Sequence, residues 1–205
     1  MHVVLLNGSP NAEGCTFTAL SEIAATLNAD NITSEIFQLG KKPVRGCVAC
    51  GVCGERGECA FQDDALPALV EAVKRADALV IGSPVYYAGP NGALCALLDR
   101  LFFSSGALLK GKPGAAVVSC RRGGASASFD RLNKYFTINQ MPVVSSQYWN
   151  SVHGFTPDDV RKDAEGLQTM RTLARNLARM LRMEAATPQR QDEEEHLWTS
   201  FADGK

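Results

Sequence analysis

The segment HVVLLNGSPNAEGCT, residues 2–16, indicates the fold of this protein. It begins with an apolar, partly β-branched run, His2–Leu6, and continues through a loop rich in Gly, Ser, Pro and Asn. The chain then shows helical spacing at Leu20, Ile23 and Leu27. A short apolar run predicts a buried strand, and this spacing predicts an amphipathic helix. We therefore expect an α/β fold that begins with a strand, a ligand-sized loop and a helix.

The same alternation continues along the chain. Further strands are predicted at 32–37, 78–84, 114–119 and 142–149, and helices at 16–27, 64–75, 92–103, 126–136 and 157–183. Five strands interleaved with helices predict a doubly wound domain, with a parallel sheet covered on both faces. We assign residues 1–183 to this domain. Residues 184–205 read as an acidic tail, either mobile or docked on a neighbouring subunit through Trp198 and Phe201.

Composition limits the possible functions. The chain has 205 residues with 45% hydrophobic and 21% charged residues and a net charge of −1, which suits one globular domain. The near-neutral charge gives no support for nucleic acid as a partner. No apolar run is long enough to cross a bilayer, and no basic leader precedes the first strand. We expect a cytoplasmic protein whose thiols stay reduced.

Ligands of such a sheet bind beyond the carboxyl ends of the strands. The loop after the first strand carries Ser9, Asn11, Gly14 and Thr16, and backbone N–H groups at a helix start bind phosphate well. The loop has no Gly-Lys-Ser/Thr sequence, which favours a phosphate monoester over a nucleotide triphosphate. A tight turn with a helix cap is the alternative interpretation.

Two later loops follow predicted strands. The first, GSPVYYAGPNG at 82–92, contains Tyr86 and Tyr87, which either pack on the rim or flank a flat aromatic ligand. The second, SCRRGGAS at 119–126, combines Arg121 and Arg122 with two glycines. Its position at a strand end makes a ligand contact by one arginine an alternative to simple solvation.

These loops, together with the segment GSPNAEGCT, resemble the flavodoxin-like NAD(P)H-dependent FMN reductase family over residues 1–183. The resemblance implies a flavodoxin-like fold and an FMN phosphate bound by the first loop. It implies that the second loop lies along the isoalloxazine ring and that the third closes over the polar edge of the ring. The residues implied are Ser9, Asn11, Gly14, Cys15 and Thr16, then Pro84, Val85, Tyr86 and Tyr87, then Ser119, Arg121, Gly123 and Gly124. Cys15 departs from the asparagine that is frequent in the family, which matters only if a side-chain amide makes that contact.

A cluster of cysteines stands between the second predicted strand and the next helix. The segment 44–60 contains C-x2-C-x2-C-x5-C, formed by Cys47, Cys50, Cys53 and Cys59. This spacing suits one iron–sulfur cluster, with zinc or free thiols as alternatives. The segment resembles the iron–sulfur flavoprotein branch of the family, which implies one [4Fe–4S] cluster. Cys95 and Cys120 are expected to be buried and inert.

Three functional hypotheses follow. The first is an oxidoreductase that passes electrons from NAD(P)H through FMN to a small acceptor, with no catalytic side chain because the flavin carries the chemistry. The second is an electron carrier with FMN and a [4Fe–4S] cluster, supplied by ferredoxin. The third is a non-enzymatic thiol or zinc redox sensor on the same scaffold. The resemblance also implies a homodimer or homotetramer.

Overall fold

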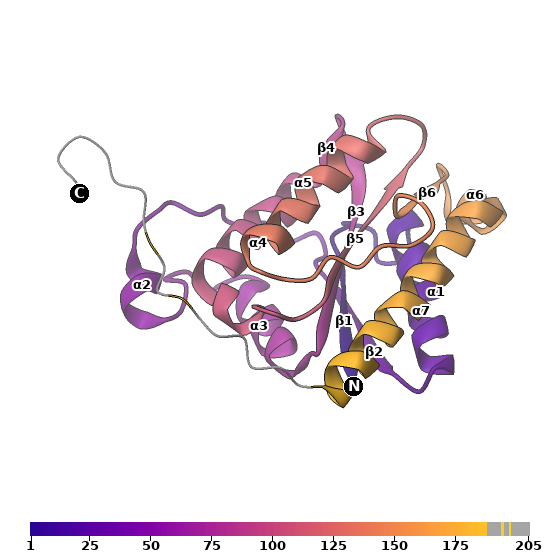
Figure 1. Ribbon diagram of the computed structural model, residues 1–205. Helices are drawn as coiled ribbons and strands as arrows, with labels where there is room; N and C mark the ends of the chain where they lie inside the picture. The colour runs from indigo at the N-terminus through magenta and orange to yellow at the C-terminus, as the bar shows by residue number, and fades with distance from the viewer. Residues whose placement is uncertain (188–193, 195–196, 198–205) are drawn as a thin grey trace.

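The computed structural model describes residues 1–187 together with residues 194 and 197. Strands and helices alternate along the chain (Figure 1). The strands are β1 (His2–Asn7), β2 (Thr33–Gln38), β3 (Ala78–Tyr86), β4 (Gly89–Pro90), β5 (Gly114–Cys120) and β6 (Ser151–His153). The helices are α1 (Cys15–Ala29), α2 (Val52–Arg56), α3 (Leu66–Arg75), α4 (Gly92–Ser105), α5 (Ala125–Ile138), α6 (Pro157–Lys162) and α7 (Ala164–Ala186), with a 3-10 turn, η1, at Gly106–Leu108.

The sheet has the strand order β2-β1-β3-β5-β6, and neighbouring strands in this path are parallel. Leu5 of β1 lies opposite Ile36 of β2 and Val80 of β3. The short β4 pairs antiparallel with the end of β3 and forms a hairpin outside this path. The expected flavodoxin-like, doubly wound parallel sheet of five strands is confirmed, with β4 as an addition.

Two hydrophobic clusters lie on opposite faces of the sheet. Because side chains alternate along a strand, Val3 and Leu5 of β1 join one cluster, whereas Val4 and Leu6 join the other. Helices α1 and α7 cover the first face, and α3, α4 and α5 cover the second (Figure 1). β1 is buried on both sides, which explains its continuous apolar sequence.

The prediction of a fifth strand at 142–149 is wrong. The last strand is β6, at Ser151–His153, and the predicted segment pairs with the sheet at an isolated bridge between Val143 and Gly114. Local polar contacts explain the difference: the Ser146 hydroxyl accepts the N–H of Tyr148 and donates to the side-chain oxygen of Asn150. Such bonds compete with the regular ladder of a strand.

The predicted single helix at 157–183 is two helices. Asp163 separates α6 from α7, and its carboxylate accepts the N–H of Gly166 as a cap. α7 buries Met170, Ala174, Leu177 and Leu181 as expected, whereas Leu167 is only partly buried.

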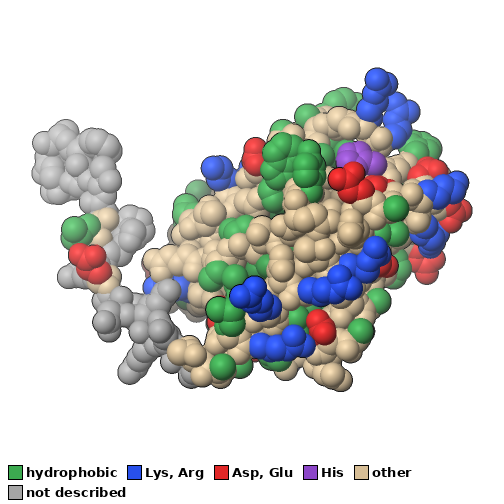
Figure 2. Space-filling view, turned by 45° about the vertical axis from the view of Figure 1, so that its right-hand side comes forward, with side chains coloured by type: hydrophobic (Ala, Val, Ile, Leu, Met, Phe, Trp, Pro, Cys, Tyr) green, Lys and Arg blue, Asp and Glu red, His purple; other side chains and the backbone are tan. Residues whose placement is uncertain are grey.

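The last helix carries four arginines, at positions 171, 175, 179 and 182, at or near the surface of the molecule. Arg175 and Arg179 are exposed, while Arg171 pairs with Glu22 and Arg182 pairs with Asp30 of the neighbouring α1 region. Basic side chains are visible on the side of the molecule that Figure 2 turns forward. Across the described residues, no helix has both the length and the apolar character needed to cross a bilayer.

The division into a domain at 1–183 and a tail at 184–205 stays a prediction. α7 continues to Ala186, three residues beyond the predicted end of the domain. Trp198 and Phe201, the aromatic residues to which we assigned a docking role, lie outside the described residues.

Candidate functional site

The three loops singled out in the sequence meet at the carboxyl edge of the sheet. They follow β1, β3 and β5, which are adjacent strands, and this edge carries the β3–β4 hairpin in Figure 1. After β1 the chain adds β2 on one side, and after β3 it adds β5 on the other side. Strand order therefore reverses between β1 and β3, which is where ligands bind in sheets of this kind.

The loop between β1 and α1 is a compact turn with available hydrogen-bond donors. Ser9 is buried and its hydroxyl oxygen accepts the N–H of Asn11 at 3.1 Å, so its own proton stays free to donate. α1 begins after Gly14, and no side chain in the described part of the chain caps it. The first N–H groups of a helix have no partner within the helix, and they carry a partial positive charge. The turn therefore presents both a hydroxyl and backbone donors to an anion.

A polar ring that the sequence reading missed supports this turn. Asn7 is fully buried, donates to Gln38 Oε1 at 2.6 Å and accepts the N–H of Ser9 at 3.1 Å. Gln38 in turn donates to the carbonyl of Ser9 at 2.7 Å. The signal in the sequence was weak, because each residue is simply a polar residue at the end of a strand. Only the pairing of β1 with β2 brings them together.

A direct contact joins the first loop to the third. The hydroxyls of Thr16 and Ser119 lie 2.8 Å apart and both residues are buried. One of the two protons fills this bond, so the other is available for a ligand. Arg121 and Gly123, the other predicted residues of the third loop, are exposed at the same edge.

The second loop is the hairpin Tyr86–Gly89. Tyr87 and Ala88 at its tip both have positive φ values, 50° and 59°, as two-residue hairpins with the right twist require. Tyr86 and Tyr87 are exposed, while Pro84 and Val85 are partly buried. Gly124 of the third loop packs against this hairpin, since a Cβ there would lie 2.7 Å from Cα of Ala88. The positive φ of Gly124, 90°, also favours glycine.

Cys15, the departure from the family pattern, is the first residue of α1. Its sulfur lies 3.8 Å from the carbonyl oxygen of Gly154. Burial raises the pKa of the thiol, and the charge of Asp159 adds to this. Cys15 is therefore a neutral thiol at neutral pH. Its backbone N–H is one of the unpaired donors at the start of α1.

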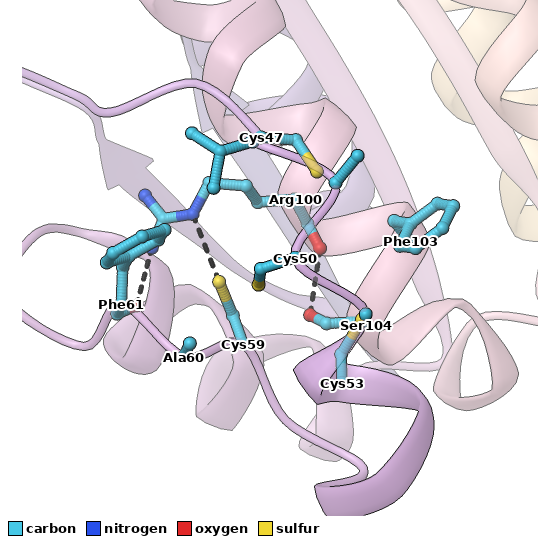
Figure 3. A pocket seen from close by; sticks show the side chains of 12 residues that line it. Cys47, Cys50, Cys53, Cys59, Ala60, Phe61, Arg100, Phe103 and Ser104 are labelled. Atoms are coloured by element: carbon cyan, nitrogen blue, oxygen red, sulfur yellow. Dashed lines mark hydrogen bonds between the residues drawn. The ribbon is translucent and has the colours of Figure 1, made fainter.

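The four cysteines of the 44–60 loop line one pocket (Figure 3). Cys47 and Cys50 are exposed, Cys53 and Cys59 are half-buried, and all seven cysteines of the chain, each within the described residues, are free thiols. The rest of the pocket wall is largely apolar and includes Phe61 and Phe103. Left-handed backbone at Ala49, Gly51 and Gly57 supplies the turns of the loop.

Arg100 is the residue of this pocket that sequence reasoning missed. Its guanidinium donates to Asp64, to two backbone carbonyls and to the sulfur of Cys59, the last at 3.3 Å. Burial by itself would raise the pKa of Asp64, but hydrogen bonds from Arg100 and from the N–H of Leu66 outweigh it and lower that pKa. The sequence signal that could have identified Arg100 is a charged residue among the apolar positions of the predicted helix at 92–103.

The two candidate sites lie at different places along α4. Asn91, which caps α4, donates to the carbonyl of Gly8 and so touches the three-loop edge. Arg100 and Ser104, in the second half of α4, line the thiol pocket. At the usual rise of a helix, Asn91 and Arg100 are roughly 14 Å apart along the axis.

Three further side chains with reactive or titratable groups, Cys95, Cys120 and His153, do not line the thiol pocket. Cys120 is buried as expected and Cys95 is half-buried, and burial raises the pKa of both thiols. His153 is exposed in β6, with its ring nitrogen 3.6 Å from Asp163.

Comparison with protein families assigns the chain. A family model described as NADPH-dependent FMN reductase matches residues 1–156. The chain belongs to this FMN reductase family. Among its curated relatives, an iron–sulfur flavoprotein of Methanocaldococcus jannaschii is 31% identical over 191 residues, covering 89% of this chain and 98% of the relative. An iron–sulfur flavoprotein of Methanosarcina thermophila is 29% identical over 191 residues, covering 89% of this chain and 96% of the relative.

Solved structures support the same fold. The structure of RosB with bound 8-demethyl-8-formylriboflavin-5′-phosphate has a TM-score of 0.76 at 15% identity and covers 100% of this chain and 92% of that one. An NADH:FMN oxidoreductase, EmoB, has a TM-score of 0.62 at 19% identity, covering 91% of this chain and 92% of the other. The fold of this FMN reductase family member is therefore shared with proteins that handle flavin phosphates.

The donors at the three-loop edge fit the phosphate of FMN. The hydroxyls of Ser9 and Thr16 and the uncapped start of α1 are neutral or partly positive donors, and a phosphate ester has only acceptor oxygens at neutral pH. Membership of the family supports FMN as the cofactor.

The four thiols fit an iron–sulfur cluster in kind and number, since such clusters take four cysteine ligands. In this structure the thiols share a pocket without converging: no three His, Cys, Asp or Glu side chains of the described residues are grouped closely enough to hold a metal ion. A cluster held by all four cysteines would require the sulfurs to lie closer together than they do here.

Proposed function

We propose that this protein is an FMN-dependent oxidoreductase that takes electrons from NAD(P)H and passes them to a small acceptor. The observation that carries the proposal is the meeting of the three loops at the β1–β3 switch point, with hydroxyl and helix-start donors on one side and exposed tyrosines on the other. Membership of the FMN reductase family supports it.

Each loop has a separate task in this proposal. Ser9, Asn11, Gly14, Cys15 and Thr16 bind the phosphate. Pro84, Val85, Tyr86 and Tyr87 flank the flavin ring, and Ser119, Arg121, Gly123 and Gly124 close over its polar edge. When bound, FMN supplies the hydride and electron-transfer chemistry, so the protein needs no acid, base or nucleophile of its own. The chain contributes orientation, through the Thr16–Ser119 contact and the packing of Gly124 on Ala88.

Anaerobic purification with FMN and iron quantified per chain tests the proposal. We expect a flavin spectrum with about one FMN per chain, and bleaching of the flavin absorbance on addition of NADH or NADPH. A protein that takes up FMN but is reduced by neither nucleotide would contradict the nicotinamide part. A colourless protein that takes up no added FMN would contradict the whole proposal and leave the thiol or zinc sensor.

A second candidate function is an electron carrier with FMN and one [4Fe–4S] cluster. The common pocket of Cys47, Cys50, Cys53 and Cys59 favours it, and the curated relatives described above are named iron–sulfur flavoproteins. In this case the four thiols hold the cluster, which supplies one-electron chemistry, and ferredoxin is the donor. About four iron atoms per chain, with reduction by ferredoxin and not by nicotinamides, would support this candidate over the first.

We also propose a homodimer or homotetramer. Val48 and Phe103 are exposed apolar side chains beside the thiol pocket, and exposed apolar surface of this kind is a place for a neighbouring subunit. Light scattering coupled to size-exclusion chromatography measures the mass, and a monomer at micromolar concentration would contradict this part.

A further inference from the structure

Arg100 is a charged residue at a buried position of α4, where apolar residues are usual. It is 1% exposed and lies on the face of α4 that also buries Leu97 and Leu101. Burying a charge is unfavourable unless the charge is paired and fully hydrogen-bonded. The hydrogen-bond partners of Arg100 therefore indicate its role in the structure.

Those partners hold the two ends of the cysteine loop. The guanidinium donates to the carbonyl of Arg45, two residues before Cys47, and to the carbonyl of Phe61, two residues after Cys59. It also pairs with Asp64, whose side chain is 7% exposed and accepts the N–H of Leu66 at the start of α3. One side chain thus ties both ends of the loop to α4 and α3.

The ion pair and the two carbonyls use the terminal nitrogens of the guanidinium and leave Nε for another partner. That N–H points to the sulfur of Cys59 at 3.3 Å, as the dashed line in Figure 3 shows. Cys59 is the fourth cysteine of the motif and follows the short helix α2, which contains the third, Cys53. Hydrogen bonds to the sulfurs are among the features that set the potential of an iron–sulfur cluster.

We propose that Arg100 is a positioning residue of the four-cysteine site, which fixes the Cys59 arm and raises the reduction potential of a cluster bound there through its Nε–H···Sγ hydrogen bond. The proposal rests on the iron–sulfur candidate function above. The bond favours the reduced cluster because a donor stabilises the added negative charge on the sulfur ligands. A guanidinium suits the task because its planar fork can serve carbonyls, a carboxylate and a sulfur at once.

The test compares two neutral replacements of the pair in protein reconstituted anaerobically with iron and sulfide. Arg100→Met/Asp64→Asn removes the donor without leaving an unpaired buried charge. Arg100→Gln/Asp64→Asn is the conservative variant, because Gln Nε2 can occupy the place of Arg Nε. Arg131→Met/Asp99→Asn is the matched control: it makes the same charge change at an ion pair between α5 and α4, which lies outside the thiol pocket.

Redox titration of the cluster absorbance gives the decisive measurement, with FMN content as the marker of an intact fold. We expect Arg100→Met/Asp64→Asn to keep FMN and iron and to shift the reduction equilibrium about tenfold toward the oxidised cluster, which is about 59 mV for one electron. The Gln variant should recover part of the shift, and the control should show none. An unchanged potential in Arg100→Met/Asp64→Asn would overturn the proposal, as would an equal shift in the control.

Loss of iron from the Met variant is also informative, because Asp64→Asn alone removes the ion pair and leaves the Cys59 contact. Iron retained by Asp64→Asn would assign the loss to the guanidinium and support the proposal. If Arg100→Met/Asp64→Asn and Asp64→Asn lost iron equally, Arg100 would act only through its ion pair, and the proposal would be overturned. A wild-type protein that takes up no iron would overturn the iron–sulfur candidate together with this inference, whereas an unchanged potential overturns the inference alone.

Discussion

Gly8 and Gly82 at the carboxyl edge of the sheet are tightly packed, whereas the glycines of the cysteine loop face open space. A Cβ built on Gly8 would lie 2.8 Å from the carbonyl oxygen of Gly82, and one on Gly82 would lie 2.9 Å from Cγ2 of Thr16. In the cysteine loop, no described atom lies within 4 Å of the Cβ position of Gly46, Gly51, Gly54 or Gly57. The three-loop site is therefore held in shape by the sheet beneath it, while the cysteine loop is held mainly at its ends.

This difference suggests two modes of ligand binding. A preorganised site binds its ligand without a large ordering cost, so its affinity depends on individual donors. A loop of four thiols that closes around a ligand couples binding to local folding. Substitutions at the sheet edge should therefore affect FMN affinity and global stability, and the same substitutions in the cysteine loop should affect neither.

The largest expected effect is on FMN affinity. The double variant Ser9→Ala/Thr16→Ala removes two hydroxyls that face the proposed phosphate position and should weaken FMN binding by about 3 kcal/mol, near 100-fold. Thr18→Ala is the matched control, because the Thr18 hydroxyl donates to the carbonyl of Gly14 within α1. Fluorescence titration of apoprotein with FMN measures the change, and equal affinity in all three proteins would mean that the phosphate binds elsewhere.

The next effect is on stability, with one substitution made in both regions. Gly8→Ala places a methyl group against backbone at Gly82 and should lower the free energy of unfolding by about 2 kcal/mol, as overpacking does. Gly46→Ala has open space and should change it by less than about 0.5 kcal/mol. Urea denaturation measures both, and similar values would remove the contrast between the two regions.

The third prediction concerns the packing between two loops. Gly124→Ala combines a positive φ with a close approach to Ala88, so it should cost about 1–2 kcal/mol of stability and also weaken FMN binding. Gly123→Ala, one residue earlier, meets no described atom within 4 Å and serves as the control for stability. Thermal unfolding with and without FMN distinguishes the variants. A Gly124→Ala protein as stable as the control would show that the third loop moves freely.

The smallest effect tests the polar ring beneath the first loop. Gln38→Leu removes the bonds to Asn7 and Ser9 and should weaken FMN binding by about 1 kcal/mol, because the loop loses support while its phosphate donors remain. Ser34→Ala, on the same strand, removes only a long contact to Asn28. Calorimetric titration with FMN compares the two, and an effect as large as that of Ser9→Ala/Thr16→Ala would make Gln38 itself a ligand contact.

Much of the fold could be predicted because the signals are local. The apolar runs of β1, β3 and β5 and the spacing in α1 and α7 gave the order of the elements. The error at 142–149 has a physical cause: Val143 and Val144 suggest a strand, but Ser146 bonds locally to Tyr148 and Asn150, and the ladder begins only at Ser151–His153. The break at Asp163 was missed because a single capping residue interrupts an otherwise helical pattern.

The sequence by itself determined the class of fold, the three loops at strand ends and the presence of four thiols on one short segment, because periodicity and spacing are properties of neighbours along the chain. The tertiary structure alone decided that Thr16 meets Ser119, that Gln38 supports Ser9 and that Arg100 reaches Cys59. These pairs are 103, 29 and 41 residues apart along the chain. Contacts of this kind depend on strand pairing and helix packing, which bring distant residues together only when the whole domain has folded.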